Sequence, residues 1–371
     1  MFYFAGIIIA VFLFALLLLK PNKELSDKIL MVWMAVMALH QLLYYIVYSG
    51  FVTRYPHLLG LSLPFPVLHG PLLFLYVCAV TRLRPIRRRD FLLHSIPFVI
   101  LVLAATPFYI LSAQEKLEVY HNQGKDFRWY INLMVVLIMA SGIGYITWSL
   151  FLIRRHRINI EQWFSSTEKK NLQWLKYLSM GLGGIWILVI FFHDQVIFTG
   201  VAVLVLFIGF FGINQLPIFY TWQGASLPPP AEPVSSEQET GEQTDEAQSA
   251  RYAKSGLKEE EARELHEKLT HLMEERALYK NNELTLSELA TQLQTHPNYL
   301  SQVINEKEQK NFYSYINTWR VKEFIQVAPR AELKHYTLLA LAYDCGFNSK
   351  STFNKYFKEF TGKSPSEYFS A

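Results

Sequence analysis

The stretch LSELATQLQTHPNYLSQVIN, residues 286–305, contains two short helical patterns separated by a tight turn. Ser287 stands where the N-cap of the first helix is expected, and the turn passes through Gln294 and Thr295. In each pattern the apolar positions recur at the spacing of one helix face: Leu289, Ala290, Leu293, Leu300 and Ile304. Two short helices joined by a tight turn predict a helix-turn-helix unit.

The same layout returns about 50 residues further along the chain. Thr337 is the expected N-cap of LLALAYDCGF, in which Gly346 supplies the turn. Asn348 then precedes the pattern STFNKYFKEF, whose inward positions are Phe353 and Phe357. One such unit is weak evidence, because any small helical domain can imitate it, but two at this spacing predict a DNA-binding domain.

An aromatic-rich helix over residues 312–327 is predicted between the two units, long enough to hold them at a fixed separation. The run CGFNSKSTFNKYFKEFTGKSPSEY, residues 345–368, resembles the C-terminal signature of the AraC family of bacterial transcription regulators. The resemblance covers about residues 284–369 and includes Arg320, at a position where the family usually has Arg. It implies sequence-specific binding to double-stranded DNA.

The chain departs from the family pattern in two places. The loop over residues 305–312 lacks the glycine often found there, and Phe369 stands where Arg is common.

Matching positions with the family implies two recognition helices that face DNA. The implied base-reading side chains are Asn298, Ser301 and Gln302 in the first helix and Lys350, Ser351, Asn354 and Lys355 in the second. Asn and Gln pair with adenine and Lys donates to guanine, whereas Ser349 and Lys358 suit phosphates. For each of these residues considered alone, the alternative to DNA contact is an ordinary side chain on a solvated helix face. Residues 296–371 carry 10 Lys and Arg against 7 Asp and Glu, so the affinity should depend moderately on salt.

Charge density divides the chain into two parts. Residues 1–222 contain 18 Lys and Arg and 9 Asp and Glu, whereas residues 223–371 contain 17 and 22. The charged share is thus about 12% before the division and about 26% after it, and only the second value is ordinary for a soluble domain. The two parts are therefore expected to fold against different solvents, which excludes a single soluble globule.

Seven apolar stretches in the first part are each long enough to cross a bilayer as a helix: residues 2–19, 29–48, 58–80, 91–111, 130–153, 175–192 and 196–220. The third contains Pro64, Pro66 and Pro71, so the alternative for it is a re-entrant loop and six spans in total. The alternative for the first is a cleaved signal peptide, but its positive flank follows the apolar run.

Lys and Arg in short loops concentrate on the cytoplasmic side of a membrane. The first, third and fifth connections carry fourteen of them: Lys20, Lys23, Lys28, Arg82, Arg84, Arg87, Arg88, Arg89, Arg154, Arg155, Arg157, Lys169, Lys170 and Lys176. The second, fourth and sixth carry four: Arg54, Lys116, Lys125 and Arg128. This asymmetry predicts a bacterial inner-membrane protein with its N-terminus outside and its C-terminal domain in the cytoplasm.

Polar side chains inside the apolar stretches are expensive in lipid and mark either a functional site or hydrogen bonds between helices. We expect hydrogen bonds between helices or contact with interfacial water for these residues: His40, Gln41, His69, Asn132 and the turn His193, Asp194 and Gln195. Two cysteines, Cys78 and Cys345, are too few for a disulfide framework or a four-thiolate metal site. No catalytic, cofactor or metal site is predicted.

Residues 223–255 are rich in Pro and acidic residues and lack aromatic side chains before Tyr252, so they are predicted to be a disordered linker. A helix over Leu257–Tyr279 follows, with one apolar stripe. The stripe packs on the following domain or, alternatively, pairs two chains as a homodimer; three heptads are short for a stable coiled coil. Because a flexible linker transmits no rigid motion, clustering of the DNA-binding domains is the preferred signalling mechanism. Confinement to the membrane and linker cleavage are the alternatives.

The sequence therefore predicts an all-α protein in three parts: a seven-helix transmembrane bundle at residues 1–222, a disordered linker at 223–255 and an AraC-type DNA-binding domain at 256–371. The predicted function is a membrane-anchored transcription regulator that couples an unknown signal ligand to transcription. Its predicted partners are double-stranded DNA and the lipid bilayer. The alternative is a membrane receptor whose helical tail is a protein-interaction module. An intramembrane enzyme or transporter has no supporting motif.

Overall fold

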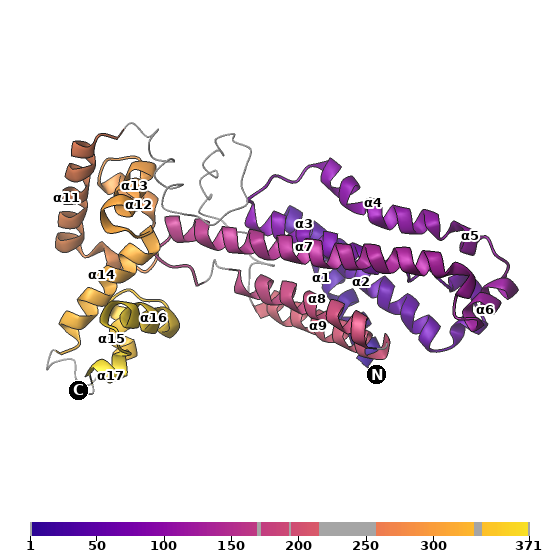
Figure 1. Cartoon of the computed structure of the whole chain (residues 1–371). Coiled ribbons are helices and arrows are strands. Elements are labelled where there is room, and N and C mark those ends of the chain that lie inside the picture. Colours follow the sequence, from indigo (N-terminus) through magenta and orange to yellow (C-terminus); the bar gives the residue numbers. More distant parts are fainter. Residues whose placement is uncertain (1, 169–171, 193, 215–256, 330–335, 370–371) are drawn as a thin grey trace. The chain divides into compact units, whose positions relative to one another are not determined.

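The protein is described by a computed structural model in which the regular secondary structure of the described residues is helical, apart from one isolated β-bridge between Phe164 and Thr285 (Figure 1). The prediction of an all-α chain is therefore confirmed for this part of the sequence. The structure describes residues 2–168, 172–192, 194–214, 257–329 and 336–369. The predicted linker, residues 223–255, lies outside them.

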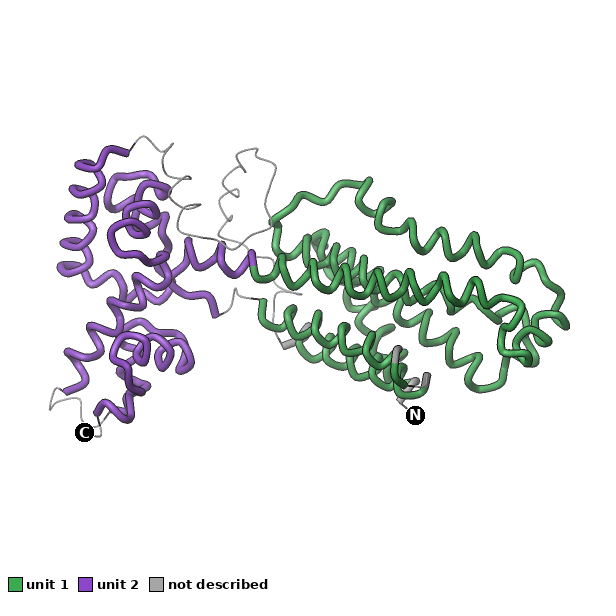
Figure 2. Tube along the Cα trace, viewed as in Figure 1, with its two compact units in different colours: residues 1–154, 172–232 green, residues 155–171, 233–371 purple. Residues whose placement is uncertain are grey.

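The chain divides into two compact units (Figure 2). The first comprises Met1–Arg154 and Leu172–Glu232, and the second comprises Arg155–Asn171 and Pro233–Ala371. The predicted domain boundaries assigned all residues before 223 to the membrane part. The structure differs, because the described residues 155–168 group with the C-terminal domain.

Apart from α6, the α-helices of the first unit follow the predicted apolar stretches. They are α1 (Phe2–Leu19), α2 (Leu25–Tyr48), α3 (Pro66–Thr81), α4 (Arg88–Ala104), α5 (Thr106–Tyr109), α6 (Ala113–His121), α7 (Arg128–Trp163), α8 (Gln173–Phe191) and α9 (Asp194–Asn214), with short 3-10 turns η1 (Phe51–Thr53), η2 (Pro56–Leu58) and η3 (Lys125–Phe127). Helix α1 packs against α2 and α9, α9 against α8, and α2 against α3. These contacts enclose an apolar core that includes Trp33, Leu73 and Leu175.

By length and composition, two helical segments of the described residues can cross a membrane, Leu25–Tyr48 and Lys125–Trp163. Three other apolar helices are shorter: Phe4–Leu19, Pro66–Thr81 and Gln195–Phe211. The described residues therefore do not support the expected seven spans.

Two of the expected spans are shortened for local reasons. The third begins only at Pro66, because proline lacks a backbone donor and is best tolerated in the first turn of a helix. The fourth is interrupted, since α4 ends at Ala104 and the short α5 follows.

Polar side chains inside the first unit hydrogen-bond across helices. Nε1 of Trp33 on α2 donates to Nδ1 of His69 on α3 at 3.2 Å, and Nε2 of His69 lies 3.1 Å from Nδ1 of His40 on α2. Because an indole N–H only donates, His69 accepts at Nδ1 and carries its proton on Nε2. The expected hydrogen bonds between helices are thus confirmed for His40 and His69. Gln41 is buried, and its side chain has no hydrogen-bond partner among the described residues.

The second unit contains the end of α7 and the helices of the predicted DNA-binding domain. They are α11 (Glu259–Arg276), α12 (Leu286–Gln292), α13 (Pro297–Glu308), α14 (Phe312–Val327), α15 (Leu338–Asp344), α16 (Lys350–Thr361) and α17 (Pro365–Phe369), with the 3-10 turn η5 (Leu278–Lys280). Helices α12 and α13 form the first helix-turn-helix unit and α15 and α16 the second. The connecting helix α14 begins and ends where the sequence predicted.

The two turns have matching geometry. Gln294 and Gly346 both adopt a positive φ, 53° and 97°. The next backbone amide closes each turn: Thr295 donates to the carbonyl of Ala290 at 3.0 Å, and Phe347 donates to that of Ala342 at 3.1 Å. Only the second turn requires glycine, because a Cβ at Gly346 would lie 2.6 Å from the carbonyl oxygen of Tyr279.

One predicted cap is wrong. Helix α12 is capped by Thr285 and not by Ser287, because Thr285 and Glu288 form a capping box. The Thr285 amide donates to Oε2 of Glu288 at 2.9 Å, and the Glu288 amide donates to Oγ1 of Thr285 at 3.2 Å. The cap of α15 at Thr337 is confirmed.

The predicted apolar stripe on residues 257–279 packs inside its own unit. Leu269 and Met273 of α11 are fully buried in one cluster with Leu289, Leu300 and Phe312. A second cluster around Phe324, Phe353 and Phe357 joins the second helix-turn-helix unit to the other end of α14. The stripe thus lies within the domain, the first of the two expected arrangements.

Candidate nucleic-acid interface

The recognition helix of the second unit has opposite apolar and polar faces. Phe353, Tyr356 and Phe357 are buried against α14 and α15. The predicted DNA-facing side chains are exposed: Lys350, Ser351, Asn354, Lys355 and Lys358. Those from Ser351 to Lys358 recur every three or four residues, so they lie on one face of the helix. This face offers amide and ammonium donors for base edges and phosphates.

The recognition helix of the first unit offers a smaller polar face. His296 caps α13, its Nδ1 accepting from the Asn298 amide at 3.2 Å. Asn298 is exposed and Ser301 half-buried, but Gln302 is 5% exposed, and its Nε2 donates to Oε1 of Glu306 at 2.9 Å. Gln302 therefore departs from the expected exposed position, because the helix turns it toward the domain.

Arg320 on α14 is buried inside the second compact unit and connects several of its segments. Its side chain is 1% exposed and donates to three backbone carbonyls. Nε donates to Tyr279 at 2.8 Å, Nη2 to Asn281 at 3.0 Å and Nη1 to Ser165 at 2.8 Å. Burial lowers the pKa of the guanidinium to about 10, so it stays charged at neutral pH.

Residues 164–168 lie against the N-terminus of α16. Phe164 is buried and forms the β-bridge with Thr285, and the Ser165 amide donates to the carbonyl of Leu284 at 3.0 Å. Oγ of Ser166 accepts from Nδ2 of Asn348 at 2.7 Å.

The carboxylate of Glu168 accepts hydrogen bonds at the first turn of α16. Its Oε1 accepts from Oγ1 of Thr352 at 2.8 Å and from Oγ of the N-cap Ser349 at 3.3 Å. Its Oε2 accepts from Oγ of Ser166 at 2.6 Å and from the Thr167 amide at 3.1 Å. Burial alone would raise the pKa of this carboxyl, but the hydrogen bonds, led by those from Ser166 and Thr352, outweigh burial and lower it.

Sequence reasoning missed part of this arrangement. Ser349 was predicted to contact phosphate, whereas here its Oγ lies 3.3 Å from Oε1 of Glu168 and 3.0 Å from Oγ1 of Thr352. Thr352 was not predicted, although it stands at the third position after the cap, where an N-terminal side chain is placed to meet an anion. Nothing in the sequence connects Glu168 with α16, since the two are far apart along the chain.

Both departures from the family pattern have a structural consequence. In the loop without glycine, Gln309 adopts a left-handed conformation with φ 52°, which glycine adopts at lower cost. Phe369 stands where the family commonly has Arg, which could make an ionic contact. Here its ring packs against Phe324 and Phe357 and extends the apolar core.

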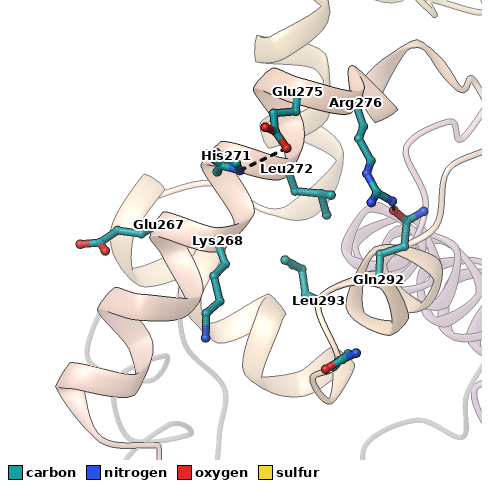
Figure 3. A pocket seen from close by; sticks show the side chains of 9 residues that line it. Glu267, Lys268, His271, Leu272, Glu275, Arg276, Gln292 and Leu293 are labelled. Carbon is teal, nitrogen blue, oxygen red and sulfur yellow. Dashed lines mark hydrogen bonds and ion pairs between the residues drawn. The ribbon is translucent and has the colours of Figure 1, made fainter.

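A hollow of about 540 Å³ opens between α11 and α12 (Figure 3). Nδ1 of His271 lies 3.4 Å from Oε2 of Glu275, and Nη1 of Arg276 donates to Oε1 of Gln292 at 3.5 Å. The described residues contain no group of three His, Cys, Asp or Glu side chains that could hold a metal ion.

This geometry defines a two-unit helix-turn-helix DNA-binding domain, and the comparison with known families agrees. Residues 289–371 match the family model described as a helix-turn-helix domain, which supports an AraC-type DNA-binding domain at the C-terminus. This part of the chain is therefore the DNA-binding domain of a transcription regulator, and the matched family is regulatory and not enzymatic. The chain matches no curated protein and no solved structure.

Proposed function

We propose that the protein is a membrane-anchored, sequence-specific transcription regulator that couples a membrane or external signal to transcription. The exposed polar face of α16 carries this proposal. Ser351, Asn354 and Lys355 can reach base edges while Lys358 contacts the backbone. Helices α13 and α16 are the two recognition helices, and α14 connects their units. This arrangement suits binding in two successive major grooves about 34 Å apart.

Apolar exposure supports the membrane part of the proposal. In the first unit, large apolar side chains point outward, including Ile8, Leu92 and Phe191 at 63%, 73% and 74% exposure. A soluble unit rarely exposes so many apolar side chains, whereas a bilayer covers them. The proposed orientation is compatible with the fold, since the described residues 155–168, proposed to be cytoplasmic, group with the DNA-binding domain.

Homodimerisation remains part of the proposal, with a changed contact. Most of the apolar stripe of α11 is buried in its own unit, so pairing through this helix would have to use a stripe residue that is only half-buried, such as Leu272 beside the hollow. Cross-linking of the full chain in detergent, compared with a Leu272→Glu variant, tests this contact.

Selection of genomic fragments by the full chain in detergent tests the DNA-binding function. A single enriched duplex motif, bound with an affinity that falls as salt rises, is expected. Enrichment of no motif together with capture of a defined protein partner would favour the alternative, a receptor with a protein-interaction tail. Reporters fused after Gln123 and Gln223 test the membrane topology: the first should be active only outside and the second only in the cytoplasm.

A further inference from the structure

The anion site at the start of α16 is already occupied by a side chain of the protein itself. The hydroxyl of Thr352 donates to Oε1 of Glu168 at 2.8 Å, and Oγ of Ser349 lies 3.3 Å from the same oxygen and 3.0 Å from Oγ1 of Thr352. These hydroxyls lie at the N-terminus of a 12-residue helix, where the helix dipole and free backbone amides favour negative charge. Ser and Thr hydroxyls and helix N-termini are common donors to DNA phosphates.

The geometry points to an autoinhibitory contact: Glu168 occupies the position of a DNA phosphate at the second helix-turn-helix unit, and DNA binding there requires residues 164–168 to leave. The inference rests on the proposed function, since it concerns regulation of the same DNA-binding surface. A phosphate and a carboxylate are both anionic acceptors, so they compete for the same hydroxyls and repel each other.

The segment is built to dock on the domain. Phe164 is buried and Trp163 packs on the first apolar cluster, while the backbone of Ser165 pairs with Leu284 and Arg320. The contacts place Glu168 at the cap with both carboxylate oxygens bonded. The position of the carboxylate is thus set by several independent contacts.

The domain keeps its own hydrogen bonds when the segment leaves. Arg320 retains Tyr279, Asn281 and Oδ1 of Asn317, the last at 3.2 Å from Nη1. Asn348 retains the carbonyl of Asn282, which lies 3.3 Å from its Nδ2. Release of residues 164–168 therefore exposes the start of α16, while these hydrogen bonds of Arg320 and Asn348 within the DNA-binding domain remain.

The same segment is joined to the first unit by helix. Helix α7 runs from Arg128 to Trp163 without interruption, and its residues up to Arg154 belong to the first unit. The backbone between the first unit and Glu168 therefore consists of α7 followed by the non-helical residues 164–168.

The first test measures binding of the full chain in detergent to a mixed-sequence duplex of roughly 30 base pairs. Glu168→Ala should tighten binding on the order of tenfold, because a larger fraction of the protein is then competent. Glu161→Ala is the matched control: it removes the same charge from a side chain that pairs with Arg157, and should change binding little. Equal affinities of wild type, Glu168→Ala and Glu161→Ala would overturn the inference and leave the proposed function standing.

The second test locks the contact. In the Ser166→Cys/Asn348→Cys variant, the side chains that meet at 2.7 Å are replaced by thiols. Oxidation should form a disulfide and abolish binding to the duplex, and reduction should restore it. A disulfide that fails to form, or an oxidised protein that binds as well as the reduced one, contradicts the inference. Absence of DNA binding by every variant in both tests would instead contradict the proposed function.

Discussion

Nη1 of Arg320 donates a hydrogen bond of 2.8 Å to the backbone carbonyl of Ser165, although the two residues are 155 positions apart in the chain. The bond joins a residue just after α7 to the helix between the two helix-turn-helix units. Since Arg320 also holds Tyr279 and Asn281, one buried side chain connects the DNA-binding domain with the segment that carries Glu168.

Replacement of Arg320 by Ala should strongly destabilise the second compact unit, which contains the DNA-binding domain. Its three carbonyl partners would lose charged donors in a buried site, a loss of about 3 kcal/mol or more in the free energy of unfolding. Lys322→Ala, on the same helix but exposed, removes only a cation–π contact with Trp319 and should change that free energy by less than about 1 kcal/mol. Thermal unfolding of the two variants measures the difference, and equal stability would contradict the role assigned to Arg320.

Gly346→Ala should also destabilise the second unit. The new Cβ would lie 2.6 Å from the carbonyl oxygen of Tyr279, and the alanine would have to keep the φ of 97°. Steric overlap and backbone strain together should cost about 3 kcal/mol. The control is Gly362→Ala, where φ is 78° but no atom lies within 4 Å of the new Cβ. It should cost about 1 kcal/mol. Chemical denaturation of both variants checks the order.

Gln309→Gly should stabilise the domain. Gln309 ends α13 with a φ of 52°, and glycine removes the left-handed strain while adding backbone entropy to the unfolded chain. The net gain should be about 0.5 kcal/mol, visible as a higher melting temperature. Lys310→Gly, one residue later and without a positive φ, should lower the melting temperature instead. A lower melting temperature for Gln309→Gly would show that the left-handed conformation is not strained.

Lys355→Ala and Lys358→Ala should weaken DNA binding in different ways. If Lys355 reads a base, its loss should cost roughly 1 to 3 kcal/mol and relax specificity at one position. Lys358 is expected to contact phosphate, so its loss should weaken binding evenly across sequences and reduce the salt dependence. Affinities measured for a set of single-base variants of the selected site distinguish the two. A uniform loss from both changes would contradict base reading by Lys355.

Cys345 should react with thiol reagents only after the second unit unfolds. It is buried, and burial raises the pKa of the thiol to about 12, so the reactive thiolate is scarce at pH 8. In the unfolded chain the pKa returns to about 9, and stability should fall as pH rises from 9 toward 12. Ser351→Cys supplies an exposed control that should react at once. Equal labelling rates at the two positions in the folded protein would exclude a buried Cys345.

The sequence by itself determined the features that depend on local spacing. Apolar residues three or four apart placed α12, α13, α14 and α16, and the turn at Gly346 and the cap at Thr337 followed from local backbone rules. The capping box of Thr285 and Glu288 was also readable, so the assignment of Ser287 overlooked a signal that was present. Local hydrogen bonds span three or four residues, which is why a short window of sequence is enough to predict them.

Only the tertiary structure decided which distant segments meet. The orientation of α13 buries Gln302, and the packing of residues 155–168 brings Glu168 to the cap of α16. Neither follows from periodicity, because periodicity shows which face of a helix is apolar but not which part of the chain covers the rest. The position of an anionic side chain at a recognition helix depends on contacts across most of the chain, and such contacts form only when the whole domain folds.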